Sequence, residues 1–238
     1  EDNMVLNDGK EQIYAPTAEG RQAWKKEWPH YRGALGKVAK DLGTCHRRVG
    51  AGNHISPKRI TTAIGYGERL RRLGQPVETT LNMGRALLLQ GGLYGCEVDY
   101  INHAQLHRLR GAMGVALWGK KTSRNIGASL LMMRDGMGDP YVARAVRVAR
   151  HWAKQVRHGR WQNAGGPEYW KTLSDCSRHI RGPGHMVKCL LRQAGILSQD
   201  GITIEGKDGV SRIDASPDIT KLVAEGARDY MWGRLARQ

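Results

Sequence analysis

The sequence predicts a mainly α-helical protein, a helical bundle with a short β-rich N-terminal segment and one C-terminal β-hairpin. Three observations indicate this fold class. Proline recurs where it suits the first turn of a helix, apolar residues recur at helical spacing, and two alternating segments flank a turn bounded by glycines. The 238 residues suffice for one large or two small domains, with a core of Leu, Ile, Val, Ala and Trp because Phe is absent.

Residues 1–55 have the least regular pattern of the chain. We expect short strands at Val5–Leu6 and Gln12–Tyr14, and a helix over residues 18–40. The sequence therefore predicts a β-rich N-terminal part, which precedes a helical part.

Five proline positions indicate where helices start. They are Ser56–Pro57, Asp139–Pro140, Gly166–Pro167, Gly182–Pro183 and Ser216–Pro217. Ser and Asp are good N-cap residues, and Pro fits the first helical position. Apolar periodicity adds helices near 78–92, 102–117 and 123–134. Gly195 is expected to end the helix that begins at Pro183.

Residues 202–213 are predicted to form the hairpin. Ile202–Glu205 and Val210–Ile213 alternate in polarity on either side of the turn Gly206–Gly209. We divide the chain into three parts, residues 1–55, 56–160 and 161–238, with the hairpin in the last.

The helix expected after Asp139 carries an unbalanced positive charge, because no Asp or Glu occurs between Asp139 and Glu168. At 100° per residue, one face of this helix holds Arg144, Arg147, Arg150, His151, Lys154, Arg157 and His158. Ion pairing within the helix does not explain this charge, since it needs a carboxylate three or four residues away. We therefore expect this face to contact a partner that carries phosphate groups.

The whole chain has a net charge of +16 at pH 7. Such a balance predicts a salt-dependent attraction to polyanions, and nucleic acid is the first partner to consider. The alternatives are a solvated basic surface and a membrane surface. No apolar run approaches the roughly 20 residues that a membrane-spanning helix needs. We therefore expect an RNA or DNA duplex as partner, no membrane and no small-molecule substrate.

The cysteines include no close pair in sequence, which predicts free thiols in a reducing compartment, nuclear or cytoplasmic. Four residues have the types of a zinc site, with the spacing C-x-x-H then H-x-x-x-C. They are Cys176, His179, His185 and Cys189. This spacing matches no common zinc module, so we favour buried thiols and partner-facing histidines over zinc.

Gly114, Gly119 and Lys120 match the start of a phosphate-binding loop. Lys121 stands where the metal-binding Ser or Thr belongs, and the preceding segment reads as a helix where such a loop needs a strand. We therefore expect Lys120, Lys121 and Arg124 to contact backbone phosphates rather than a nucleotide.

Two pairs of carboxylates lie close in sequence, Asp135 with Asp139 and Glu97 with Asp99. Neither pair occurs in an apolar strand that would raise a pKa or direct both groups at one metal. We interpret them as helix caps and surface charges. No G-x-S-x-G motif occurs, and no Cys and His arrangement has a third orienting group. The sequence therefore predicts no catalytic residues of its own.

The order of several short motifs carries a family resemblance. The first are Lys40–Gly43, Glu68–Leu73 and Ala86–Glu97. The later ones are Arg124–Leu131, Asp139–Pro140, Gly182–Pro183, the Asp208–Gly209 hairpin with Ile213–Asp214, Ser216–Pro217 and Tyr230–Ala236. The first group resembles the region just after the catalytic palm of non-LTR retrotransposon reverse transcriptases. The later group resembles the segment that such polyproteins, notably those of dinoflagellate type, carry downstream of the polymerase. The resemblance extends over nearly the full chain.

The resemblance implies a role for each part of the chain. Lys40, Asp41, Leu42 and Gly43 would belong to the strand pair that grips the primer end. Residues 1–55 would then be the end of the palm with the primer grip, 56–160 a basic helical thumb-like domain, and 161–238 a helical connection region. Lys10 would match a palm lysine near the incoming nucleotide, although Glu11 stands where Thr or Ser is usual.

The family's catalytic aspartate pair lies upstream of these motifs, and this sequence has no Tyr-x-Asp-Asp or Ala-x-Asp-Asp motif. Phosphoryl transfer without the two metals lacks the charge stabilisation that they supply. The resemblance therefore implies a truncated or degenerate segment that is inactive alone. It would need no cofactor, with Mg²⁺ only in a complete polymerase.

The residues and the resemblance together predict a non-catalytic segment that binds a template–primer duplex without reading its sequence. The expected contacts are Arg59, Arg69, Arg71, Arg72, Lys120, Lys121, Arg124, Arg144, Arg147, Lys154 and Arg157. Trp118, Trp152 and Trp161 either stack on bases or pack in the core, and we favour the core for Trp152. Two alternatives stay open: a helical protein–protein interaction module that binds an acidic partner, and a phosphate-handling enzyme around Lys120.

Overall fold

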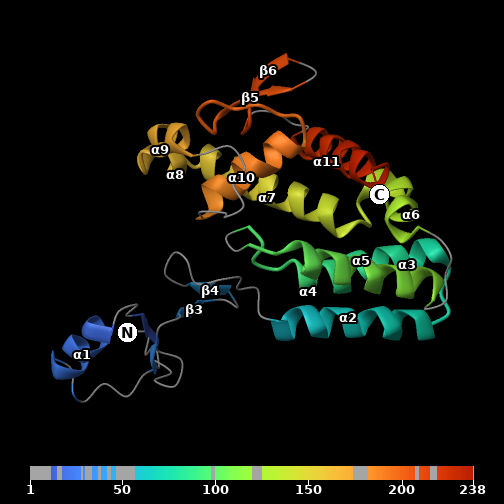
Figure 1. Ribbon diagram of the computed structural model, residues 1–238, viewed down its shortest axis with the longest axis horizontal. Helices are drawn as coiled ribbons and strands as arrows, with labels where there is room; N and C mark the ends of the chain where they lie inside the picture. The colour runs from blue at the N-terminus through green and yellow to red at the C-terminus, as the bar shows by residue number, and fades with distance from the viewer. Residues whose placement is uncertain are drawn as a thin grey trace, which may run out of the picture.

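The computed structural model is mainly helical, as the sequence predicts, with only two-stranded sheets among the described residues. It describes residues 12–14, 18–27, 29, 34–36, 39–41, 44–46, 57–97, 100–119, 125–173, 182–206, 209–214 and 219–237. Figure 1 shows the helices from α2 onward stacked in rows, with α2 at one edge, the roughly parallel α3 to α5 next to it, and α7, α10 and α11 beyond at a tilt. This stack positions the functional site.

The described residues of the N-terminal part form one helix and four short strands. They are β1 (Gln12–Tyr14), α1 (Ala18–Glu27), β2 (Ala34–Gly36), β3 (Ala39–Asp41) and β4 (Thr44–His46). β1 pairs with β2 in parallel, and β3 pairs with β4 antiparallel. The strand at Gln12–Tyr14 is confirmed, but the helix predicted over 18–40 is wrong beyond Glu27. Pro29 explains why α1 ends early, because a proline ring disfavours the α conformation at the residue that precedes it. Val5–Leu6 lies outside the described residues.

The next helices form the first half of the stack. They are α2 (Pro57–Arg72), α3 (Val77–Gly84), the π-helix η2 (Arg85–Leu89), α4 (Gln90–Gly92) and α5 (His103–Trp118). The predicted helix near 78–92 is confirmed as one run of α, π and α turns. α2 approaches α5 closely at Gly67, where a Cβ atom would lie 2.5 Å from the carbonyl oxygen of Ala112. Only glycine permits this contact between the two backbones.

The second half of the stack begins after α5. Its elements are α6 (Ile126–Met132), the 3₁₀ helix η3 (Arg134–Gly136), α7 (Pro140–Arg157), α8 (Arg160–Asn163), α9 (Gly166–Thr172), α10 (Gly182–Gln193) and α11 (Ile219–Leu235). The helix starts predicted from Pro57, Pro140, Pro167 and Pro183 are confirmed. Asp139 caps α7 by accepting a hydrogen bond of 2.9 Å from the Tyr141 amide. Ser216–Pro217 lies outside the described residues.

The predicted hairpin is confirmed as β5 (Thr203–Gly206) and β6 (Gly209–Arg212), paired antiparallel. The loop before it caps a cluster of three tryptophans. The indole N–H groups of Trp152, Trp161 and Trp170 donate to the carbonyl oxygens of Gly201, Asp200 and Ser198, at 2.8, 3.0 and 3.0 Å. Trp152 is buried, so the core position favoured for it is confirmed. Trp161 and Trp118 are partly buried and pack against the same core.

One hydrophobic core runs through both halves of the stack, with members from Ile60 to Met231. It continues across residue 160, where the sequence pattern placed a boundary, because Val156 at the end of α7 and Trp170 on α9 belong to it. Residues 56–160 and 161–238 therefore share their core. No helix in the described ranges has both the length and the apolar character that crossing a bilayer requires.

Candidate nucleic-acid interface

The exposed side of α7 faces η2, α4 and the turn after α4 across a groove of about 770 Å³, which we call the α7 groove. Figure 1 shows α7 and α4 in adjacent rows of the stack. Basic side chains line the groove: Arg85, Arg147, Arg150, His151, Lys154, Arg157 and His158. Glu97 is the one carboxylate among its described lining residues. The groove is therefore a concave surface with a strong excess of positive charge.

Arg150 and Lys154 are the most available cations of this groove. Both are exposed, one turn apart on α7, and among the described residues no carboxylate forms an ion pair with either. Arg157, one turn further on, is exposed as well, and its Nη2 donates to the carbonyl oxygen of Asp214 at 2.9 Å. These three side chains follow the groove along one side of a single helix, which suits contact with successive phosphates.

Arg147 lies in the groove but its charge is balanced within the fold. Its Nε forms an ion pair with Glu97, and its Nη1 donates to Gln90 Oε1 at 2.7 Å. The expectation that no carboxylate balances this face is therefore wrong at Arg147. The partner comes from the turn after α4, fifty residues away in sequence, where helical spacing gives no information about contacts.

Arg144 does not lie in the groove. Its side chain is buried, with 8% of the residue exposed, and its Nη1 donates to the carbonyl oxygen of Ile101 at 3.0 Å. The prediction that Arg144 contacts nucleic acid from an exposed face is wrong. Arg144 is at the edge of the basic arc of α7, and the segment before α5 covers this edge. Burial also lowers the pKa of its guanidinium.

Tyr94 connects the groove to α2. The guanidinium carbon of Arg59 lies 4.8 Å from the centre of the Tyr94 ring, and that of Arg147 lies 5.9 Å from the same ring. Arg59 Nη1 also donates to the Tyr94 carbonyl oxygen at 3.0 Å. Further along α2, Arg69 lies 5.7 Å from the Tyr66 ring, and a shallow hollow between the two tyrosines is lined by both and by Arg59. Cations and aromatic rings thus alternate from α2 to the α7 groove.

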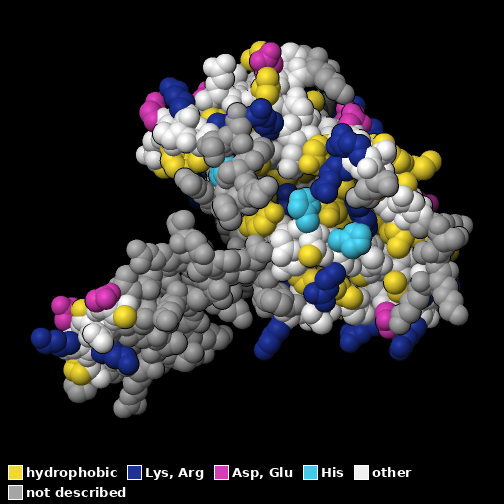
Figure 2. All heavy atoms as spheres, viewed as in Figure 1, with side chains coloured by type: hydrophobic (Ala, Val, Ile, Leu, Met, Phe, Trp, Pro, Cys, Tyr) yellow, Lys and Arg dark blue, Asp and Glu magenta, His cyan; other side chains and the backbone are white. Residues whose placement is uncertain are grey.

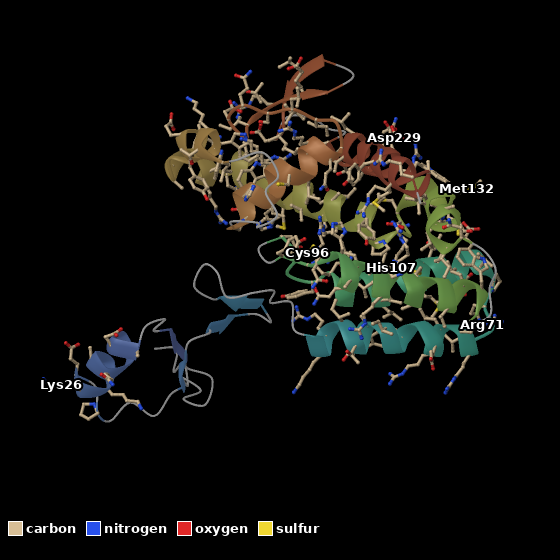
Figure 3. The ribbon with its side chains drawn as sticks, in the orientation of Figure 1. Lys26, Arg71, Cys96, His107, Met132 and Asp229 are labelled. Carbon is tan, nitrogen blue, oxygen red and sulfur yellow. The ribbon has the colours of Figure 1, made fainter. Side chains whose placement is uncertain are left out.

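The remaining basic residues of α2 lie away from the groove. Arg71 and Arg72 are exposed at the C-terminal end of the helix, where Figure 3 labels Arg71. Figure 2 shows Lys and Arg side chains projecting from the edge of the molecule that α2 forms. Lys120, Lys121 and Arg124 lie outside the described residues. Gly114 lies inside α5 and packs against Ile126. The predicted helix is therefore confirmed at Gly114, where a phosphate-binding loop would have required a turn of the backbone instead.

The predicted strand-pair and zinc residues lie elsewhere. Lys40 and Asp41 belong to β3, paired with β4, whereas Leu42 and Gly43 lie outside the described residues. His185 and Cys189 are buried one turn apart on α10, and Cys176 and His179 are not described. Within the described ranges, no three His, Cys, Asp or Glu side chains group closely enough to hold a metal ion.

Two described groups, Cys96 and His151, illustrate how burial changes acidity. Burial raises the pKa of the Cys96 thiol to about 12, and Cys96 and Cys189, both buried, form no disulfide within the described ranges. In the groove, partial burial lowers the pKa of His151. The positive charges of Lys154 and Arg160 lower this pKa further, whereas the negative charge of Glu97 raises it. His151 is therefore largely neutral at pH 7 and gains a proton most readily when an anion approaches.

Sequence reasoning missed Arg85 and Gln90 as members of the groove. Arg85 is the first residue of the π-helix η2, and the wider π turn lies directly opposite the basic side of α7. No motif marks Arg85, and the sequence pattern over 78–92 reads as ordinary α-helix. To predict Arg85 as part of the groove, one would have had to know that η2 packs opposite α7.

Comparison with protein-family models, curated proteins and solved structures finds no match to this chain. The functional conclusion therefore rests on the groove and on the residues that form it.

Proposed function

We propose that this protein binds the sugar-phosphate backbone of nucleic acid, without reading base sequence, through the α7 groove. The observation that carries the proposal is the groove's lining: seven Arg, Lys and His side chains against one described carboxylate. Cationic side chains at helical spacing make phosphate contacts, which fix the position of a duplex but carry no sequence information.

The residues around Tyr94 favour a binding path longer than the groove itself. The row from Arg69 through Tyr66, Arg59 and Tyr94 to Arg147 presents guanidinium groups and aromatic rings in alternation. Tyr94 is 41% exposed, so bound nucleic acid has access to its ring. A duplex in the groove would extend over this row along α2, from Arg59 near its N-terminal end toward Arg69 near its C-terminal end.

The order of motifs further suggests that the chain is a thumb and connection segment like that of a non-LTR retrotransposon reverse transcriptase. A thumb must hold a template–primer duplex while the enzyme moves along it, and sequence-blind backbone contacts meet this need. The sequence lacks the aspartate pair of that family, so binding without polymerisation is the function that we propose for this chain.

The proposal is tested by fluorescence anisotropy with a DNA duplex, an RNA duplex and an RNA–DNA hybrid, each in two unrelated sequences. The expected dissociation constant rises steeply between about 50 and 200 mM salt and differs little between the two sequences of each kind. Heparin, a polyanion without nucleic-acid geometry, serves as the competitor. Absence of binding at low salt would refute the proposal, and competition by heparin as strong as that by duplex would favour the acidic-partner module instead.

A further inference from the structure

A second basic cavity of about 530 Å³ lies where the N-terminal end of α5 meets the start of α6 and the C-terminal end of α11. Its polar lining consists of His103, His107, Arg110, Asn125, Tyr141 and Arg234. Among the described residues that line it there is no carboxylate, and none of them lines the α7 groove. Figure 3 labels His107 on the face in view, and Figure 2 shows His next to Lys and Arg side chains there, with Asp and Glu toward its margins.

Contacts between neighbouring elements hold one wall of the cavity in place. Arg234 Nη1 on α11 lies 3.5 Å from His103 Nδ1 on α5. The Tyr141 hydroxyl on α7 donates to the His103 carbonyl oxygen at 3.2 Å, and the two rings lie 5.7 Å apart. A guanidinium and an imidazole therefore meet at the cavity without a described carboxylate between them.

Arg110 supplies a buried donor to the same cavity. Only 7% of the residue is exposed, its Nη2 lies 2.7 Å from Asp139 Oδ2, and its guanidinium carbon lies 4.5 Å from the centre of the Tyr141 ring. Its Nε is buried and has no hydrogen-bond acceptor among the described residues. Because a buried N–H without an acceptor is costly, an oxygen atom of a ligand at this place would stabilise it.

The start of α5 adds to this positive potential. The helix has 16 residues and begins at His103, after a capping box formed by Asn102 and Gln105. The first turn of α5, where the positive end of the helix dipole lies, therefore borders the cavity through His103 and Ala104.

We propose that this cavity binds a phosphate group, with Arg234, His103 and His107 around its terminal oxygens and Arg110 Nε beneath them. A phosphate monoester or inorganic phosphate offers three or four oxygens in different directions, which fits donors that come from α5 and α11 at once. A carboxylate offers two oxygens in one plane and would leave donors unused. The proposal is independent of the α7 groove, since the two sites share no residue.

The test is a titration of the full chain with inorganic phosphate at constant ionic strength, followed by the NMR signals of the histidine rings. The pKa of His103 is lowered by burial, by Arg234 on α11 and by Arg144 on α7, and the Tyr141 ring lies 5.7 Å from the His103 ring. Bound phosphate should shift the His103 and His107 signals saturably and raise the pKa of His103. Shifts that chloride reproduces at equal ionic strength would overturn the proposal.

Arg234→Gln should weaken phosphate binding at least about tenfold, because it removes a charge-assisted hydrogen bond. His107→Gln is a second variant in case the first does not fold, and thermal melting followed by circular dichroism checks both. Lys171→Gln, an exposed lysine on α9 that lines neither the cavity nor the α7 groove, is the control and should leave phosphate binding unchanged. Phosphate affinity that survives in both folded cavity variants would refute the site.

Competition with oligonucleotides then identifies the source of the phosphate. If a 5′-phosphorylated strand displaces inorganic phosphate more strongly than its 5′-hydroxyl counterpart, the cavity holds a nucleic-acid end. If both strands displace it equally weakly, the ligand is a small phosphate ester, and either result supports a phosphate site.

Discussion

Glu97 forms an ion pair with Arg147, and it is the one carboxylate among the described residues that line the α7 groove. The pair removes one positive charge from a surface that is otherwise cationic. It also fixes the turn after α4 against α7, so the same contact shapes the groove and reduces its attraction for polyanions. The first prediction follows from this double effect.

Glu97→Gln should tighten nucleic-acid binding about threefold to tenfold at low salt, since it removes a repulsive charge and releases Arg147. The salt dependence should steepen, by a slope of about 0.9 if Arg147 then neutralises one phosphate. Glu78→Gln is the matched control, because Glu78 is also ion-paired, with Arg134, but does not line the groove. Unchanged or weaker binding by Glu97→Gln would place the bound duplex elsewhere.

Replacing Arg150 and Lys154 by Gln should weaken duplex binding and reduce the slope of the logarithm of affinity against the logarithm of salt. The reduction should be about 1 for each phosphate that the variant no longer neutralises. Both residues are exposed on α7, so the melting temperature should hardly change. Lys171→Gln, an exposed lysine on α9, is the control and should bind like the unchanged protein. A slope that stays the same in the double variant would contradict the groove as the binding site.

Arg144→Ala should lower the free energy of unfolding by about 2 kcal/mol, because it removes a buried side chain and leaves the Ile101 carbonyl oxygen without its donor. The salt slope of nucleic-acid binding should not change at a temperature where the variant is folded. Chemical denaturation and anisotropy on the same preparation measure the two effects. A reduced slope with unchanged stability would restore Arg144 as a phosphate contact.

Nucleic-acid binding should strengthen by about threefold as pH falls from about 8 to 5.5, because neutral His151 takes up a proton when phosphate approaches. Burial, Lys154 and Arg160 hold the pKa of free His151 below its ordinary value, so bound anion raises it and binding is coupled to proton uptake. His151→Gln should flatten this pH dependence. Isothermal titration calorimetry in two buffers measures the protons taken up, and equal uptake by the variant would assign them to another group.

Asp200→Ala should lower the free energy of unfolding by about 1–2 kcal/mol, because it loosens the loop that holds the tryptophan cluster. In this loop the Asp200 carboxylate accepts hydrogen bonds from the amides of Ile202 and Thr203 at 2.8 and 2.7 Å. Burial opposes the ionised form, but these hydrogen bonds outweigh it and lower the pKa of Asp200. Its stabilisation is therefore present above about pH 4 and is lost as pH falls through the folded-state pKa. Urea denaturation at several pH values tests this, with Glu225→Ala on α11 as control. If the free energies of unfolding of Asp200→Ala and the unchanged protein still differed as much well below pH 3, the stabilisation would not come from the ionised Asp200 carboxylate.

Local physical chemistry explains why much of the helical framework was predictable. Pro140 cannot extend a helix backward and Asp139 satisfies a free amide, so α7 had to begin there whatever packs around it. The early end of α1 before Pro29 follows from the same rules, which the apolar pattern over 18–40 obscured.

The site was predictable only on the side that one helix determines. Helical spacing placed Arg147, Arg150, Lys154 and Arg157 on one face of α7, and the structure places them together in the groove. Arg144, at the edge of that face, is buried instead, because the arc of a helix that stays exposed depends on which neighbours cover it. Spacing along one helix contains no information about these neighbours.

The sequence by itself determined the helices, their caps and the positive charge of α7, because these properties depend on residues within a few positions of one another. Tertiary structure alone decided that Glu97 meets Arg147, that Arg85 faces α7 from a π turn, and that His103 meets Arg234 from 131 residues away. Contacts of this kind depend on how helices pack, and packing depends on the shape of the whole core rather than on the local order of residues.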